Sequence, residues 1–133
     1  MIVVDASALV ELLLGSRVGR TLADRLLAPA ETLHAPHLVD LEVVHAIRRQ
    51  ALAGELTPAR GAEVIHDLRL VPLHRYPHDA LLPRIWELRG ALTAYDASYA
   101  ALAEAPDATL VTCDGSLSRS TGHDAKIEFH ARG

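Results

Sequence analysis

The chain has 133 residues, of which 50% are hydrophobic, with a formal net charge of −4 and one cysteine, Cys113. This length fits one domain with a substantial core, and the composition excludes global disorder and an internal disulfide framework. The negative charge gives no general attraction to nucleic acid. The start of the chain lacks the features of a signal peptide, and no apolar run approaches the ~20 residues of a membrane span. We therefore expect a soluble, cytoplasmic protein.

Short apolar runs alternate with helical patterns along the whole chain. Strands are predicted at 1–5, 31–35, 71–76, 108–114 and 126–130. Helices are predicted at 7–15, 17–28, 36–54, 57–70, 79–90 and 95–105. Pro36 is expected to open the long third helix and Gly54 to end it, while Pro72 marks an edge strand or a strand beginning. This alternation predicts a single α/β domain over residues 1–133, with a parallel sheet covered by helices on both faces.

Two predicted strands deliver an aspartate at the end of an apolar run. Asp5 ends "IVVD" and Asp114 ends "LVTCD". One such aspartate is commonly a turn residue or a helix N-cap. In a parallel sheet, however, the carboxyl ends of the strands share the edge at which ligands bind. The pair therefore leaves two interpretations open, a capping role and a binding site.

Two further acids lie on predicted helices. Glu42 has mostly apolar neighbours on its helix surface, which places it at the margin of the buried stripe, whereas Asp40 points elsewhere and is expected at the surface. Asp96 lies in the first turn of "LTAYDASYAALAEA", where Thr93 and Asp96 have the spacing of a capping box. The structural alternatives are an edge-of-core Glu42 bonded to a helix end or an arginine, and an Asp96 that only caps its helix.

Convergence of Asp5, Glu42, Asp96 and Asp114 would gather four negative charges. Clustered carboxylates either take up protons or hold a cation, and oxygen ligands suit Mg²⁺ or Mn²⁺. Acidic centres of this kind usually act on phosphates, where the metal clamps oxygens and activates a water for in-line attack. The chain has no GxxxxGK phosphate loop, which argues against a nucleotide-triphosphate switch.

With these four acids in place, the sequence resembles the PIN-domain ribonucleases, and within them the VapC toxins of bacterial toxin–antitoxin pairs. The resemblance rests on "MIVVDASALVELLL", "APHLVDLEVVHAIRR", "LTAYDASYAALAEA" and "TLVTCDGSLSR", in family order and spacing. It implies a PIN-like three-layer α/β/α domain with a central parallel sheet of about five strands. It also implies an endoribonuclease that hydrolyses single-stranded or looped RNA with Mg²⁺ or Mn²⁺.

The resemblance also implies roles for individual residues. The implied metal ligands and catalytic residues are Asp5, Glu42, Asp96 and, as a more variable fourth acid, Asp114. Ser7 and Thr112 match positions where a hydroxyl supports the site, with a helix-cap or turn role as the alternative. His45 stands where many relatives carry asparagine, and it is either a neighbour of the site and of an RNA phosphate or a surface residue.

RNA binding needs cations that the acids do not supply. Candidates are Arg48 and Arg49 beyond Glu42, Arg119 after the Asp114 turn, and His45, each with a solvated side chain as the alternative. Because the chain has few aromatic residues, specificity is expected to come mainly from RNA shape and backbone contacts.

The segment "ALVELLLG" bears on partners. Its apolar side chains surround nearly the whole predicted helix, which indicates burial on several sides, by core packing alone or also by an interface. The resemblance implies a homodimer and a cognate VapB-type antitoxin, which could block the site by placing an arginine among the acids.

Other function classes remain open at this stage. A DNA flap nuclease or a small phosphatase could use a similar acidic site, although phosphatases with a covalent aspartate want a second aspartate where this chain has Ser7. A non-catalytic binding module with a relic acidic pocket is the alternative outside enzymes.

Overall fold

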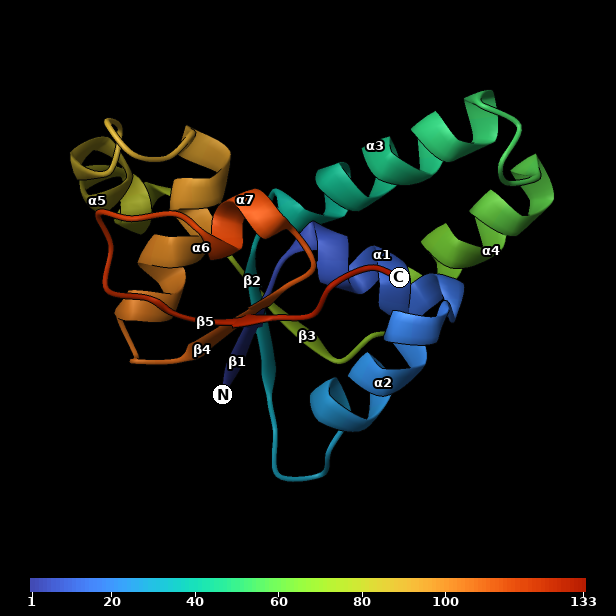
Figure 1. Ribbon diagram of the computed structural model, residues 1–133, viewed down its shortest axis with the longest axis horizontal. Helices are drawn as coiled ribbons and strands as arrows, with labels where there is room; N and C mark the ends of the chain where they lie inside the picture. The colour runs from blue at the N-terminus through green and yellow to red at the C-terminus, as the bar shows by residue number, and fades with distance from the viewer.

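Five short parallel strands form the centre of the computed structural model, which describes residues 1–133 (Figure 1). They are β1 (Ile2–Val4), β2 (Leu33–Pro36), β3 (Leu73–Tyr76), β4 (Thr109–Thr112) and β5 (Lys126–Phe129). Their order across the sheet is β3-β2-β1-β4-β5, and every neighbouring pair is parallel. Strands β2 and β3 are added in turn on one side of β1, and β4 and β5 are then added on its other side. The carboxyl ends of β1 and β4 are therefore the topological switch point at which α/β folds bind ligands.

Helices cover both faces of the sheet. They are α1 (Ala6–Leu14), α2 (Arg17–Leu26), α3 (Val39–Leu52), α4 (Pro58–Leu68), α5 (Leu82–Glu87), α6 (Ala94–Glu104) and α7 (Gly115–Ser118), with a 3-10 turn η1 at Asp79–Leu81. Helices α1 and α2 lie on one side of the sheet and α5 and α6 on the other, while α3 and α4 form a hairpin that reaches beyond it (Figure 1). This arrangement confirms the predicted three-layer α/β/α fold. No helix combines the length and the apolar content needed to cross a membrane.

The core explains why α1 is apolar nearly all the way round. Ala8, Leu9 and Val10 are buried, and the three leucines that end the helix are partly buried against the same core. Helix α1 contacts α2, α3, α4 and β4, so it has apolar neighbours in several directions. Core packing therefore accounts for this helix, and the helix itself gives no indication of a further interface.

The main error in the predicted elements concerns Pro36. It ends β2 in register with Tyr76, and α3 begins only at Val39. The missing N–H of Pro36 interrupts no ladder. On the β3 side, the N–H of the next residue, His37, donates to Tyr76. On the other side, β1 pairs only with Leu33 and His34 of β2. The strand can therefore end on a proline, and the helix starts without one.

Two smaller differences lie elsewhere. The predicted helix at 79–90 is divided into η1 and α5, with Pro83 in the first turn of α5. Helix α7, which directly follows Asp114, was not predicted at all. It is a single short turn, and so few residues carry no helical periodicity that a sequence pattern could show.

Candidate active site

Asp5 joins β1 to α1 and is held by three hydrogen-bond donors. Its Oδ1 accepts the backbone N–H of Ala8 at 3.0 Å and the hydroxyl of Ser7 at 2.7 Å, and its Oδ2 accepts the hydroxyl of Thr112. Asp5 is only 5% exposed, and this burial raises the pKa of its carboxyl although the three bonds oppose the effect. Asp5 is therefore the N-cap of α1 and, at the same time, an oriented carboxylate at the switch point.

Two hydroxyl groups connect the turns that follow β1 and β4. The Ser7 hydroxyl accepts the N–H of Cys113 at 2.9 Å, and the Thr112 hydroxyl accepts the N–H of Asp114 at 2.9 Å. The two hydroxyl oxygens lie 3.3 Å apart. The Asp114 carboxylate in turn accepts the N–H of Ser116 at 2.9 Å and caps α7. Ser7 and Thr112 thus fix the positions of both strand-end aspartates.

Glu42 enters the site from α3 and bonds to a tyrosine of α6. The buried Tyr99 hydroxyl donates to Glu42 Oε1, so the partner is neither of the two that the structural alternative proposed, a helix end or an arginine. Burial raises the pKa of Glu42, and the negative charges of Asp5 and Asp96 add to this effect against the Tyr99 bond. Burial and the neighbouring Glu42 also raise the pKa of Tyr99, which keeps its hydroxyl a neutral donor.

Asp96 lies in the first turn of α6 without capping it through its side chain. Thr93 caps the helix by accepting the Asp96 N–H at 3.1 Å. The Asp96 carboxylate is half-buried, and its pKa is raised by burial and by the charge of Asp114, with no hydrogen bond to lower it. Only half of a capping box therefore forms, and the Asp96 side chain is free for another partner.

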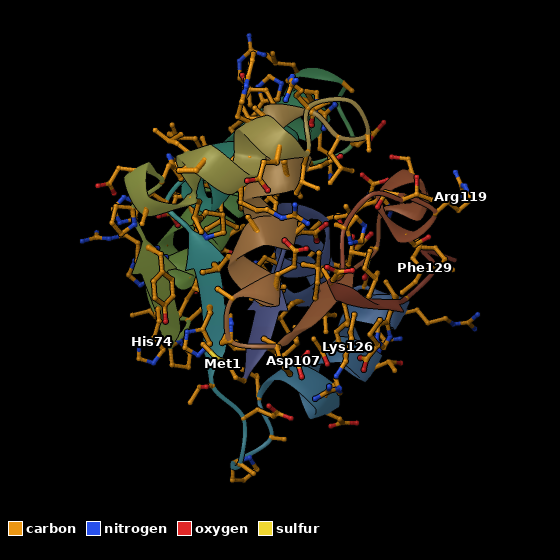
Figure 2. The ribbon with its side chains drawn as sticks, turned by 90° about the vertical axis from the view of Figure 1, so that its left-hand side faces the viewer. Met1, His74, Asp107, Arg119, Lys126 and Phe129 are labelled. Atoms are coloured by element: carbon orange, nitrogen blue, oxygen red, sulfur yellow. The ribbon has the colours of Figure 1, made fainter.

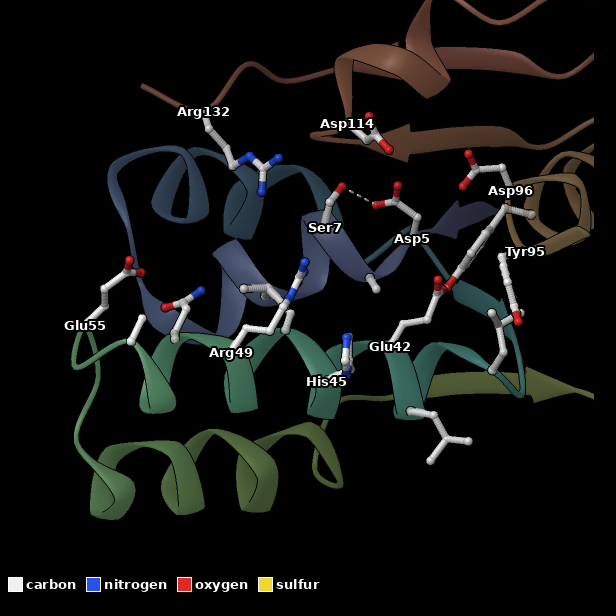
Figure 3. Close-up of a pocket in the computed structure, with 18 residues that line it drawn as sticks. Asp5, Ser7, Glu42, His45, Arg49, Glu55, Tyr95, Asp96, Asp114 and Arg132 are labelled. Carbon is white, nitrogen blue, oxygen red and sulfur yellow. Dashed lines mark hydrogen bonds between the residues drawn. The ribbon is translucent and has the colours of Figure 1, made fainter. Parts of the chain in front are cut away.

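One cleft of about 910 Å³ brings these acids together (Figure 3). Asp5, Glu42, Asp96 and Asp114 all line it, and none of them forms an ion pair with a basic group. No three His, Cys, Asp or Glu side chains of the molecule lie close enough together to hold a metal ion in their present positions. The cleft therefore carries carboxylates that no ion pair neutralises, spread around its walls.

The donor set in this cleft fits a hard divalent cation. Carboxylate oxygens are the ligands that Mg²⁺ and Mn²⁺ prefer, and a nearby cation favours the ionised state that burial opposes in three of these acids. The residues able to hold such an ion are Asp5, Glu42, Asp96 and Asp114. Asp40, by contrast, lies outside the cleft and pairs with Arg75 at 2.7 Å.

The candidate RNA-binding residues divide into two groups. His45 and Arg49 line the cleft, whereas the exposed Arg48 and Arg119 do not. Figure 2 shows Arg119, which directly follows α7, at the outer surface of the molecule.

Tyr99 and Arg132 are among the residues that line the cleft but were not predicted from the sequence. Tyr99 lies three positions after Asp96, a spacing that puts both side chains on one face of α6 and could have indicated it. Arg132 follows β5, and the carboxyl end of a parallel strand lies at the same edge as Asp5 and Asp114. Both signals depend on first knowing the arrangement of the elements.

The family model of the PIN domain matches residues 2–122. The chain belongs to the PIN-domain family. Ribonuclease VapC12 of Mycobacterium tuberculosis is 41% identical to this PIN-domain chain over 131 residues, which cover 98% of the chain and 100% of the relative. Ribonuclease VapC9 of the same species is 48% identical over 118 residues, 89% of each protein. These relatives assign the chain to the VapC group within the family.

The fold of the PIN-domain chain also matches solved structures. VapBC2 from Rickettsia felis, solved bound to a DNA fragment from its promoter, aligns with a TM-score of 0.70 over 97% of this chain and 98% of the solved chain. Their sequence identity is 19%, so the likeness concerns the fold alone.

Proposed function

We propose that this chain is a metal-dependent endoribonuclease and acts as the toxin of a toxin–antitoxin pair. The observation that carries the proposal is the cleft at the β1 and β4 ends, where four carboxylates gather without a basic partner. The chain belongs to the VapC group, and the two relatives described above are named ribonucleases, which supports RNA as the substrate. The cytoplasm is then the expected place of action.

The proposed metal ligands are Asp5, Glu42, Asp96 and Asp114, whose side chains would close around one or two Mg²⁺ or Mn²⁺ ions. When bound, such an ion neutralises phosphate oxygens and lowers the pKa of water, which supplies the nucleophile for phosphodiester hydrolysis. Ser7 and Thr112 orient Asp5, and Tyr99 orients Glu42. Because the site is partly buried, its negative charges are poorly screened and attract a cation strongly.

Cleavage of matched oligonucleotides tests this proposal directly. The purified chain should cut RNA in the presence of Mg²⁺ or Mn²⁺. Cleavage should cease when a chelator removes the metal, and DNA of the same sequence should remain uncut. Asp5→Asn keeps the shape of the side chain but removes its charge, so we expect cleavage to fall by about 100-fold or more. Circular dichroism of the variant should match the wild type.

Two results would contradict this scheme. Full activity of Asp5→Asn would mean that the proposed site is wrong. Equal cutting of DNA would favour the alternative of a nuclease acting on DNA, such as a flap nuclease.

Thermal melting in the presence of Mn²⁺ tests the metal site without any substrate. A ligand that binds only the folded state stabilises it by RT ln(1 + [L]/Kd), so the Tm should rise with millimolar Mn²⁺. Glu42→Gln and Asp96→Asn should reduce the rise, whereas Asp40→Asn, an acid outside the cleft, should leave it unchanged. A wild-type Tm that does not change with Mn²⁺ would favour a non-catalytic binding module with a relic acidic pocket.

We also propose a VapB-type antitoxin and a second copy of the chain as partners. The fold of VapBC2, a complex of this kind, supports the first partner, and the family resemblance implies the second. Induced expression should arrest growth, Asp5→Asn should not, and a cognate antitoxin should restore growth. Sequencing the RNA ends produced by the wild type, with Asp5→Asn as the control, would identify the target.

A further inference from the structure

Two arginines line the acidic cleft, and they come from distant parts of the chain. Arg49 lies on α3, and Arg132 lies in the segment that follows β5. They are the only arginine or lysine side chains that line the cleft. Figure 3 shows both guanidinium groups entering the same space beside Ser7 and Asp5, one from each wall.

Neither arginine is neutralised by the protein. Other basic residues form ion pairs, such as Arg75 with Asp40 and Arg84 with Glu104. Arg49 and Arg132 form none, although Glu55 and the four acids described above line the same cleft. Two like charges thus line one cleft, and neither has a carboxylate within ion-pair distance. An anionic ligand entering the cleft would meet both.

The structure also explains how Arg132 reaches the cleft. The ladder between β4 and β5 continues one residue past β5, because the His130 N–H donates to the Thr112 carbonyl at 2.9 Å. The His130 ring lies 2.8 Å from Glu128, which in turn pairs with Arg25 of α2. His130 is therefore fixed beside Thr112, whose hydroxyl holds Asp5. Two further residues extend at most ~7 Å, so Arg132 stays at this edge of the sheet.

We propose that Arg49 and Arg132 together bind the RNA backbone next to the phosphate that is cut, on the side where both guanidinium groups enter the cleft. This inference rests on the proposed ribonuclease function and adds a substrate-binding role for the segment after β5. Four carboxylates repel a polyanion, and a bound cation offsets this repulsion most strongly for the phosphate it touches. The neighbouring phosphates need cations of their own, and the planar guanidinium donates two parallel hydrogen bonds to a phosphate.

Charge-neutral variants of each arginine test the proposal in two assays. The first measures kcat and KM for cleavage of a fluorescent RNA oligonucleotide by Arg49→Gln, Arg132→Gln and the double variant. The second measures the Kd of the same RNA by anisotropy over a range of salt concentrations, with Asp5→Asn added to every protein to prevent cutting. Arg48→Gln and Arg119→Gln are matched controls, because they remove the same charge from arginines outside the cleft.

We expect each cleft substitution to raise KM and Kd by about 5- to 20-fold and to change kcat by less than about threefold. The slope of log Kd against log salt should fall by about 0.7 per lost phosphate contact on single-stranded RNA. Arg132→Lys should keep the slope but lose part of the affinity, since lysine keeps the charge without the planar fork. The controls should match the wild type in both assays.

Three outcomes would overturn the inference. The first is an unchanged Kd and salt slope for Arg132→Gln in a protein that binds RNA. The second is tighter binding or faster cleavage by Arg132→Gln, which would show that Arg132 blocks the acids. The third is an effect of Arg48→Gln as large as that of Arg49→Gln, which would indicate a diffuse charge effect.

The two assays separate this inference from the proposed function. If the wild type binds RNA with the expected dependence on Arg49 and Arg132 but never cuts it, only the proposed function fails. If it cuts RNA equally well without the two arginines, only the inference fails. If it does not bind RNA at all, both fail.

Discussion

Asp5 combines a structural and a chemical role in one carboxylate. One of its oxygens caps α1, where the partial positive charge of the helix start favours an ionised acid, while burial favours the protonated form. Asp96 divides the same roles differently, because its backbone N–H takes part in the cap and its carboxylate does not. The choice between helix cap and site residue, which the sequence left open, therefore has a different answer at each position.

Thr93 and Asp96 allow a direct comparison of stability and activity. Thr93→Ala removes the acceptor of the Asp96 N–H and should lower the free energy of unfolding by about 1 kcal/mol, with kcat/KM nearly unchanged. Asp96→Asn removes a half-buried charge that no partner offsets, so it should lose cleavage and keep or gain stability in the absence of metal. Urea unfolding and RNA cleavage measure the two effects. An Asp96→Asn variant that loses stability but still cuts RNA would return Asp96 to a capping role.

Thr112 allows the two hydrogen bonds of its hydroxyl to be removed while the size of the side chain is kept. Thr112→Val should leave the Asp5 carboxylate short of a donor and the partly buried Asp114 N–H without its acceptor. We expect a loss of about 1–3 kcal/mol in the free energy of unfolding and a lower rate of cleavage. Thr112→Ser keeps the hydroxyl and should stay within about 1.5 kcal/mol of the wild type. If Val and Ser behave alike, the hydroxyl does not orient Asp5.

At the scale of elements, α6 connects the cleft with the far side of the molecule. Its first two turns supply Asp96 and Tyr99 to the cleft. At its end, Glu104 accepts two bonds from Arg84 of α5, at 2.9 and 2.8 Å, and the N–H of Asp124 before β5 at 2.8 Å. One carboxylate thus ties α5 and the segment before β5 to the helix that carries the acids.

This contact predicts a dependence of stability on pH. The bonds from Arg84 hold the pKa of Glu104 below its ordinary value of 4.5. A lowered pKa means that the stabilisation is fully present above the ordinary value and is lost as the pH falls through the pKa of the folded state. Glu104→Gln should therefore cost about 1–2 kcal/mol at pH 7, and its difference from the wild type should shrink below pH ~4. Urea unfolding at several pH values checks this, and a difference that grows in acid would contradict it.

The elements themselves were largely predictable, because each strand and each longer helix has a local apolar period. All five strands and the sheet edge that gathers Asp5 and Asp114 follow from that pattern. Pro36 was misassigned because proline suits a helix start and a strand end equally well from local sequence. The Tyr99 bond to Glu42 and the position of Arg132 depend on packing between distant segments. Such relations leave no periodic signal. The acids of the site could be found because each has a local sign, a strand end for Asp5 and Asp114, apolar helix neighbours for Glu42 and a helix start for Asp96, and the family resemblance then gave them a common role.

The whole molecule leaves part of its apolar surface uncovered, and this bears on assembly. Leu82 and Trp86 lie one turn apart on α5 and are 55% and 67% exposed. Arg89 stacks over the Trp86 ring at 4.5 Å but leaves most of it open to solvent. An exposed apolar pair of this kind is a natural contact for the homodimer that the family resemblance implies.

Light scattering tests this expectation. The wild type should have twice the chain mass of 14.3 kDa, and Trp86→Ser should shift the equilibrium towards the monomer. Leu52→Ser removes a similarly exposed apolar side chain at the end of α3 and should not change the mass. A Trp86→Ser protein that remains fully dimeric would place the contact elsewhere.

The two ends of the chain lie at opposite ends of the parallel strands, since Met1 precedes β1 and Gly133 follows β5 (Figure 1). The Met1 amino group pairs with Glu31 at 3.1 Å, at the amino ends of the strands. Gly133 ends the segment that brings Arg132 to the cleft, at their carboxyl ends. An affinity tag fused after Gly133 would be separated from Arg132 by Gly133 alone and would obstruct access to the cleft. A tag before Met1 would leave from the amino ends of the strands and disturb only a partly exposed ion pair. Assays of this protein should therefore carry the tag at the N-terminus, because a C-terminal tag could make an active enzyme look inert.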